Sequence, residues 1–253
     1  ELGNSMQASK GFYGLSDIQP FVVEATTTAT TRKTTIVAND IAGETLVIEW
    51  GDGNREVVVA VDPDTILNHT YATDGTFQIK LYTKATVPSI QCLAAEGAEQ
   101  DLVIRKVVSW GQLDVKHYQF IGCAELTTVP LTTPPHVIEA TEMFKDCLKF
   151  NTDISSWNTT AVTHMDGMFL NATSFNANLS GWNVANVIDM SEMFSGATSF
   201  NGSVAGWDVS NVTDMSGMFL GATSFNRGLN DWNTQSLTEM KGMFQGATSF
   251  NQS

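Results

Sequence analysis

The chain has 253 residues, with 27 acidic against 13 basic residues and a formal net charge of −14. This length is enough for two ordinary domains, each with a core of its own. The acidic excess argues against nucleic acid and anionic membranes as partners, because Lys and Arg must neutralise such negatively charged surfaces.

Residues 1–20 show no clear period and are interpreted as an N-terminal arm or linker. Between residues 21 and 90, short β-branched segments alternate with turn clusters, which predicts a β-sandwich. The strongest strand candidates are residues 21–25, 46–50, 56–61 and 76–82.

Three motifs follow one another within this predicted sandwich. They are Trp50-Gly51-Asp52-Gly53, Asn68-His69-Thr70-Tyr71 and Asp74-Gly75-Thr76-Phe77. Together they resemble the polycystic kidney disease (PKD) domain, although the aromatic residue usual after Trp50 is missing and Phe77 stands where Tyr is usual. The resemblance implies an immunoglobulin-like sandwich of the kind found in extracellular proteins, and we expect His69 to make a structural hydrogen bond.

Residues 91–115 are interpreted as a connector and the N-terminal cap of a solenoid, which residues 116–253 form with an incomplete last coil. A constant 25-residue interval separates copies of one sequence pattern, and such a period indicates stacked structural repeats. Spacings of 3, 4 and 3 between Val187, Met190, Phe194 and Ala197 predict a short helix in each coil, followed by an extended segment. The predicted fold is therefore mainly β with short helices.

The first, degenerate copy runs from Phe120 to Val129 with the spacing F-x-x-C-x-x-L-x-x-V. This spacing resembles the BspA-like leucine-rich repeat, and the later M-F…F-N…W copies resemble a bacterial surface-protein repeat. The resemblance implies a leucine-rich-repeat-like solenoid on a secreted or cell-surface protein.

Aromatic residues at equivalent positions should stack as ladders and fill the core, although the Trp ladder is alternatively a glycan-stacking platform. A parallel ladder of Asn side chains, from Asn151 to Asn251, should bond backbone groups at the turns. The aromatic ladders are Phe144, Phe169, Phe194, Phe219 and Phe244, and Trp157, Trp182, Trp207 and Trp232.

Stacked carboxylates at Asp189, Asp214 and Glu239 repel one another, which is tolerable on a wet surface and which bound calcium would also relieve. Exposed carboxylates in the sandwich turns at Asp52, Asp62 and Asp64 are further weak calcium candidates. No other cofactor is expected.

Cys123 and Cys147 occupy the same repeat position, where later coils have Ala. Their expected spacing is within disulfide range, but an interior slot favours two reduced, buried thiols.

No nucleophile elbow, phosphate loop, dinucleotide fingerprint or histidine metal motif is present, so we expect no catalysis. Seven Asn residues lie in N-x-S/T sequons, which are possible glycosylation sites in a eukaryotic secretory protein and, in a bacterium, simply follow from a repeat rich in Asn, Ser and Thr. They are Asn68, Asn158, Asn171, Asn178, Asn201, Asn211 and Asn251.

The sequence therefore predicts a non-catalytic secreted or cell-surface repeat protein that mediates adhesion or protein–protein interaction. The alternatives are a structural subunit of an extracellular filament and a glycan-binding accessory module of a polysaccharide-degrading system. The given sequence stops within a coil, for which further repeats, head-to-tail self-association and a frayed last coil are three open explanations.

Overall fold

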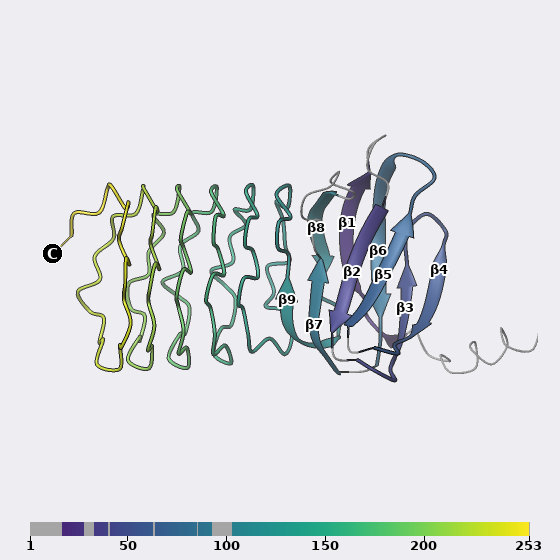
Figure 1. Ribbon diagram of the computed structural model, residues 1–253, viewed down its shortest axis with the longest axis horizontal. Coiled ribbons are helices and arrows are strands. Elements are labelled where there is room, and N and C mark those ends of the chain that lie inside the picture. The colour runs from purple at the N-terminus through teal and green to yellow at the C-terminus, as the bar shows by residue number, and fades with distance from the viewer. Residues whose placement is uncertain are drawn as a thin grey trace, which may run out of the picture.

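The computed structural model describes residues 17–27, 33–39, 41–62, 64–84, 86–92 and 103–252. These residues form nine strands and a stack of coils, and they include no helix (Figure 1). Most of the predicted N-terminal arm, and residues 93–102 of the predicted connector, lie outside the described residues.

Two antiparallel sheets pack face to face at one end of the molecule, as a β-sandwich requires (Figure 1). The first has the order β4-β3-β6-β1-β8, and the second has the order β5-β2-β7-β9, in which only β7 and β9 are parallel. The strands predicted at residues 21–25, 46–50, 56–61 and 76–82 are confirmed as β1, β3, β4 and β6. The strand bounds are β1 Phe21–Thr27, β2 Lys33–Asn39, β3 Thr45–Glu49, β4 Arg55–Val59, β5 Asp64–Thr70, β6 Gly75–Tyr82, β7 Thr86–Cys92, β8 Val103–Ser109 and β9 Asp114–Gln119.

Both sheets continue into the coils without a break in hydrogen bonding. β8 and β9 fall largely within the stretch expected to be a connector, yet each belongs to a sheet of the sandwich. A parallel bridge joins β9 to the first full coil at His117 and Glu139, and β8 contacts the preceding turn at Lys106 and Thr128. One continuous cluster of buried apolar residues therefore runs from the sandwich through the coils.

The short helix predicted in each coil is absent, because the backbone uses its N–H groups differently. In the third coil, the N–H groups of Met190, Glu192, Phe194 and Gly196 donate to carbonyls of the next coil. Alternate N–H groups, such as that of Met193, donate to the carbonyl three residues back. The 3-4-3 apolar spacing thus comes from two tight turns, since a helix would need each N–H for an i→i−4 bond.

These turns need a left-handed backbone at two positions of every coil. The first position holds Glu142, Gly167, Glu192, Gly217 and Gly242, with φ between 52° and 67°. The second position, four residues later, holds Asp146, Asn171, Gly196, Gly221 and Gly246. Gly and Asn tolerate such a backbone, whereas Glu is strained in it.

Equivalent aromatic rings repeat at nearly constant separations along the stack. The ring centroids of Trp182 and Trp207 are 6.5 Å apart, those of Trp207 and Trp232 are 6.3 Å apart, and both pairs are within 5° of parallel. Phe194 lies 5.5 Å from Phe169 and 5.6 Å from Phe219. A single screw step therefore relates neighbouring coils, as the constant 25-residue interval predicts.

Candidate interaction face

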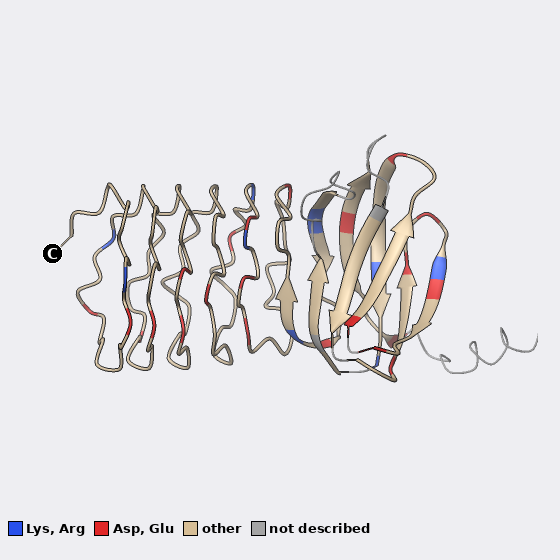
Figure 2. Cartoon of the chain, in the orientation of Figure 1, with Lys and Arg blue, Asp and Glu red and all other residues tan. Residues whose placement is uncertain are grey.

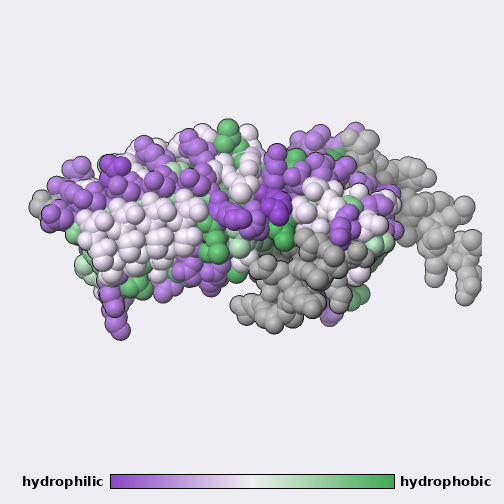
Figure 3. All heavy atoms as spheres, turned by 90° about the horizontal axis from the view of Figure 1, so that it is seen from above, coloured by the Kyte–Doolittle hydropathy of each residue, from purple (hydrophilic) through white to green (hydrophobic). Residues whose placement is uncertain are grey.

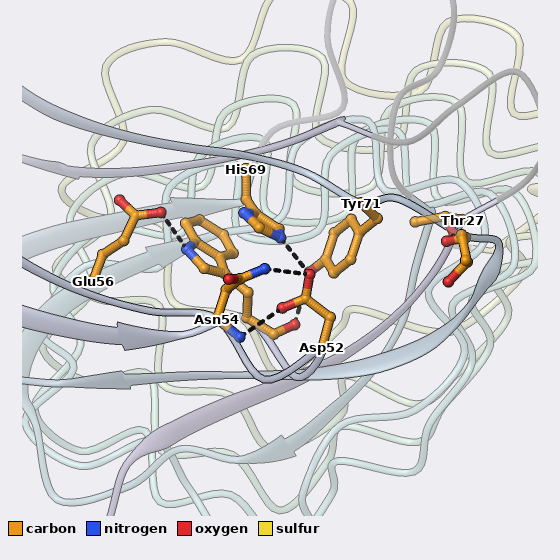
Figure 4. A network of polar contacts seen from close by, with 8 residues as sticks. Thr27, Asp52, Asn54, Glu56, His69 and Tyr71 are labelled. Atoms are coloured by element: carbon orange, nitrogen blue, oxygen red, sulfur yellow. Dashed lines mark hydrogen bonds and ion pairs between the residues drawn. The ribbon is translucent and has the colours of Figure 1, made fainter.

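The sequence motifs at residues 50–53 and 68–71 meet in one polar network at the β3–β4 turn (Figure 4). Nε2 of His69 lies 2.7 Å from a carboxylate oxygen of Asp52, and the His69 ring stacks on Trp50 at 4.9 Å. The Tyr71 hydroxyl donates to the Trp50 carbonyl. Burial raises the pKa of Asp52, but hydrogen bonds from His69 and Asn54 outweigh it, so the net pKa is below the ordinary value. The structural hydrogen bond expected of His69 is confirmed.

The five calcium candidates lie in three separate places. Asp52 belongs to the network just described, whereas Asp62 and Asp64 flank the turn between β4 and β5. Asp189 and Asp214 lie on the coils, where each accepts a hydrogen bond from the N–H two residues later. Within the described ranges, no group of three or more His, Cys, Asp or Glu side chains is arranged to hold a metal ion.

The aromatic ladders form the core. Trp157, Trp182 and Trp207 are buried, and each indole N–H donates to a backbone carbonyl of the preceding coil. Trp232 and Phe244 are partly buried against the same core. The alternative reading of this ladder as a glycan-stacking platform is therefore wrong for Trp157, Trp182 and Trp207, because their side chains are at most 5% exposed.

The Asn ladder bonds backbone groups, as predicted. The side-chain oxygen of Asn176 accepts the N–H of Asn201, and that of Asn201 accepts the N–H of Asn226. Two sequon side chains also join neighbouring coils, but as donors: the amide N–H of Asn171 donates to the Asp146 carboxylate, and that of Asn211 donates to the carbonyl of Ala185. A glycan on either of these amide nitrogens would leave one N–H of the two, at a group that joins two coils.

Cys92, Cys123 and Cys147 are free and buried. The Cys123 thiol donates to the Cys92 carbonyl and the Cys147 thiol donates to the Phe120 carbonyl, both at 3.1 Å. Burial raises the pKa of the Cys123 thiol to about 12. The structure thus has the reduced, buried thiols that the interior repeat position favours.

One side of the coil stack carries most of its acidic residues, and we call it the ladder face. It comprises residues 139–142, 164–167, 189–192, 214–217 and 239–242, which contain seven carboxylates and one lysine. Its backbone is a ladder of parallel bridges through Glu139, His164, Asp189, Asp214 and Glu239. In Figure 2 the acidic residues recur at similar positions on successive coils.

The flanks of the stack are different from this face. Seen from above, the coils present repeated rows of hydrophilic and near-neutral residues (Figure 3). Apart from this view, Thr173, Thr198 and Thr223 form a row of uncharged side chains along the coils, and each donates its hydroxyl to a carbonyl of the coil before. Charge on the coils is therefore concentrated along the ladder face.

Most carboxylates of the ladder face make a hydrogen bond or an ion pair within the protein. Asp189 and Asp214 cap their own turns, Asp166 accepts the Thr141 hydroxyl, and Glu142 pairs with Lys145 at 2.5 Å. This pairing with Glu142 raises the pKa of the Lys145 ammonium.

Two carboxylates of this face, those of Glu239 and Glu192, have no such partner among the described residues. Glu192 is also strained. Its side chain is exposed, its φ is 54°, and its carboxylate has no hydrogen bond or ion pair with any described residue. The coils after it have Gly217 and Gly242 at the same position, and these glycines form part of the lining of an open hollow of about 430 Å³. Glu192, Glu239 and Lys241 also line the hollow. A strained residue without a structural partner is a feature typical of binding sites.

This hollow does not follow from the sequence when the segment is interpreted as a helix. The available signal was the alternation of Glu and Gly at one position every 25 residues. Gly recurs at this repeat position because the backbone is left-handed there. Once that conformation is known, Glu192 is unusual, because it is not a glycine.

Residues 138–253 match the family model described as Mycoplasma protein of unknown function, DUF285. The match covers the full coils and leaves out the sandwich, and it fits the expected surface-protein repeat loosely. No match is found among curated proteins or among solved structures. Within the described residues there is no helix long and apolar enough to cross a membrane.

Proposed function

We propose that this chain is a non-catalytic, secreted or cell-surface interaction protein whose ladder face binds a cationic partner protein. The observation that carries the proposal is Glu192, a strained, exposed carboxylate that makes no bond within the described protein. A left-handed conformation costs an L-residue other than Gly about 1–2 kcal/mol. No hydrogen bond or ion pair of the described residues offsets this cost at Glu192, whose charge acts on Lys145 only at longer range. Binding to a Lys or Arg of a partner supplies the missing interaction.

The fold assignment behind this proposal has two parts. We infer that the sandwich is PKD-like, on the grounds that two of its three motifs meet in the network around His69 and that Phe77 of the third stacks on Tyr71. We further infer that the coils are a leucine-rich-repeat-like solenoid of the bacterial surface-protein type, supported by the 25-residue step and the family match over residues 138–253. Both resemblances belong to extracellular proteins, which supports secretion or surface display.

A direct test places a photo-reactive amino acid at Ser216 on the ladder face, and at Ser199 on the flank as a matched control. The full chain is then irradiated in a native surface extract, and cross-linked proteins are identified by mass spectrometry. We expect a partner with a basic patch from position 216 only. Equal cross-linking from both positions contradicts the proposal.

Binding of that purified partner is next compared between Glu192→Gly and Asp208→Asn. Asp208 is an exposed acid of the same coil outside the ladder face, so its loss controls for net charge. We expect Glu192→Gly alone to weaken binding, by about five-fold or more, and the wild-type affinity to fall with added salt. Equal affinities of the two variants would contradict a role for the ladder face.

A further inference from the structure

The Glu192 side chain extends along the stack onto the next coil. A Cβ atom at Gly217, the equivalent position of that coil, would lie 3.3 Å from Cγ of Glu192. The same relation holds one repeat pair earlier, where a Cβ atom at Gly167 would lie 3.3 Å from Cγ of Glu142. Glycine is therefore found where the acidic side chain of the preceding coil lies across the backbone.

The corresponding place over Gly242 is open. Gly217 precedes Gly242 in the stack and has no side chain to lie across it. Among the described residues, the only atoms within 4 Å of a Cβ atom at Gly242, apart from its chain neighbours, belong to Gln245 of the same coil. The opening is part of the hollow of about 430 Å³, which Glu192 borders. The hollow is thus the space that a long side chain at position 217 would occupy.

The lining of this hollow suits a long basic side chain. Leu220 forms an apolar part of the wall, on which the methylene groups of such a side chain can pack. Glu192 and Glu239 supply carboxylates that have no hydrogen bond or ion pair among the described residues. Ser191 and Ser216 add hydroxyl groups, which can accept further N–H donors.

The charges of the lining fit a single cation. Its two carboxylates and the ammonium of Lys241 leave a net charge of −1, which one cationic side chain neutralises. A second cation on the same ligand would meet Lys241 and be repelled. A guanidinium suits the dispersed acceptors better than an ammonium does, because its N–H donors diverge in one plane.

We propose that this hollow binds one arginine side chain of the partner protein. The inference rests on the proposed function and deepens it, because it names the side chain that the ladder face recognises. The arginine stem packs on Leu220 and crosses the backbone of Gly242, and its guanidinium pairs with Glu192. Lys241 makes the hollow selective for an isolated arginine over a cluster of basic residues.

The probe for a first test is N-acetyl-L-arginine amide, whose blocked ends leave the guanidinium as its only charge. It is titrated into the isotope-labelled full chain, and the backbone amides of Gly217 and Gly242 are followed by NMR. We expect saturable shifts at both amides, which the neutral analogue N-acetyl-L-citrulline amide does not produce, and binding at least about three-fold weaker for N-acetyl-L-lysine amide. Tighter binding of free L-arginine than of the blocked amide would assign the hollow to the free amino acid and overturn the proposal.

Substitutions then test the individual walls with the same probe. Glu192→Gln should weaken binding by about five-fold or more, because it removes the charge that pairs with the guanidinium. Leu220→Ser should weaken it by about two- to three-fold, whereas Leu170→Ser, a half-buried Leu at the same repeat position outside the hollow, is the matched control. Lys241→Ser, which introduces the residue of the two preceding coils, should instead tighten binding by about two-fold.

Several results would overturn the arginine site. They are equal shifts with the arginine and citrulline probes, equal affinity for the arginine and lysine probes, unchanged binding in Glu192→Gln, equal effects of Leu220→Ser and Leu170→Ser, and weaker binding in Lys241→Ser. A failed probe together with a partner whose binding still depends on Glu192 means that the ladder face acts without the hollow. Equal partner affinities of Glu192→Gly and Asp208→Asn refute the ladder-face function itself, whatever the probe does.

Discussion

Replacing Glu192 by Gly should stabilise the protein while weakening its binding. Glu192 has a φ of 54°, and three of its four equivalents are glycines with φ values of 57°, 62° and 67°. The left-handed conformation costs Glu about 1–2 kcal/mol. Gly also increases the conformational entropy of the unfolded chain, which lowers the free energy of unfolding by about 0.4–1 kcal/mol. The expected net gain in the free energy of unfolding is about 0.5–1 kcal/mol.

The assay is urea denaturation of the wild type and two variants, followed by circular dichroism. Glu142→Gly is the matched control, because Glu142 has a φ of 52° at the same repeat position but pairs with Lys145. An exposed pair of this kind contributes up to about 1 kcal/mol, so Glu142→Gly should gain less than Glu192→Gly. A loss of stability in Glu192→Gly would refute the reasoning, since it would mean that the carboxylate has a structural partner.

Four further predictions concern the core, the coil ladder, the sandwich and the thiols. Phe194→Ala should lower the free energy of unfolding by about 3–5 kcal/mol, whereas the surface control Ser199→Ala should change it little in the same denaturation assay. Asn201→Ala leaves the N–H of Asn226 without its acceptor and should cost about 1 kcal/mol, with faster hydrogen exchange at that amide. The pKa of Asp52 is lowered in the folded state. The ionised Asp52 therefore stabilises the fold above the ordinary carboxyl pKa, and this stabilisation is lost as the pH falls through the folded-state pKa. Asp52→Asn should accordingly reduce the loss of stability that the wild type shows in acid. The buried thiols should resist iodoacetamide at pH 8 in the folded protein and react only after unfolding, and rapid labelling of the native chain would contradict their burial.

The stack of coils was predictable from the sequence, because residues 25 positions apart in the sequence occupy equivalent positions in neighbouring coils. The interval of 25 residues is enough to place Trp182 above Trp207 and to assign both to the core. The Asn ladder was predictable for the same reason, since an amide recurring at a turn needs a backbone partner in each coil.

Prediction failed where one spacing fits two backbone conformations. Apolar residues at intervals of 3, 4 and 3 fall on one face of a helix, and they also point inward from two consecutive tight turns. The choice depends on whether each N–H bonds within the coil or to the next coil, which the spacing of Met190 and Phe194 alone does not reveal. Recurrent Gly at the position of Gly217 and Gly242 is the feature that excludes a regular helix.

The end of the sandwich was predicted too early for a related reason. β8 and β9 pair with strands distant in sequence. β8 joins β1 through contacts such as Val23–Val107, more than 80 residues apart, and such pairings leave no local pattern. Their second role, as the surface on which the first coil stacks, is the one that the sequence analysis recognised.

This double role of β8 and β9 explains how an irregular sandwich and a regular stack share one core. A coil stack needs its first edge covered, because that edge exposes both backbone groups and apolar side chains. Here the cover is a pair of sheet edges, whose hydrogen bonds continue into the coils through His117 and Lys106. Trp110 packs against Trp157 at 5.8 Å and Phe120 against Phe144 at 6.0 Å, so aromatic side chains bridge the same junction. The sandwich therefore sets the starting position and direction of the stack, and with them the direction in which the ladder face points.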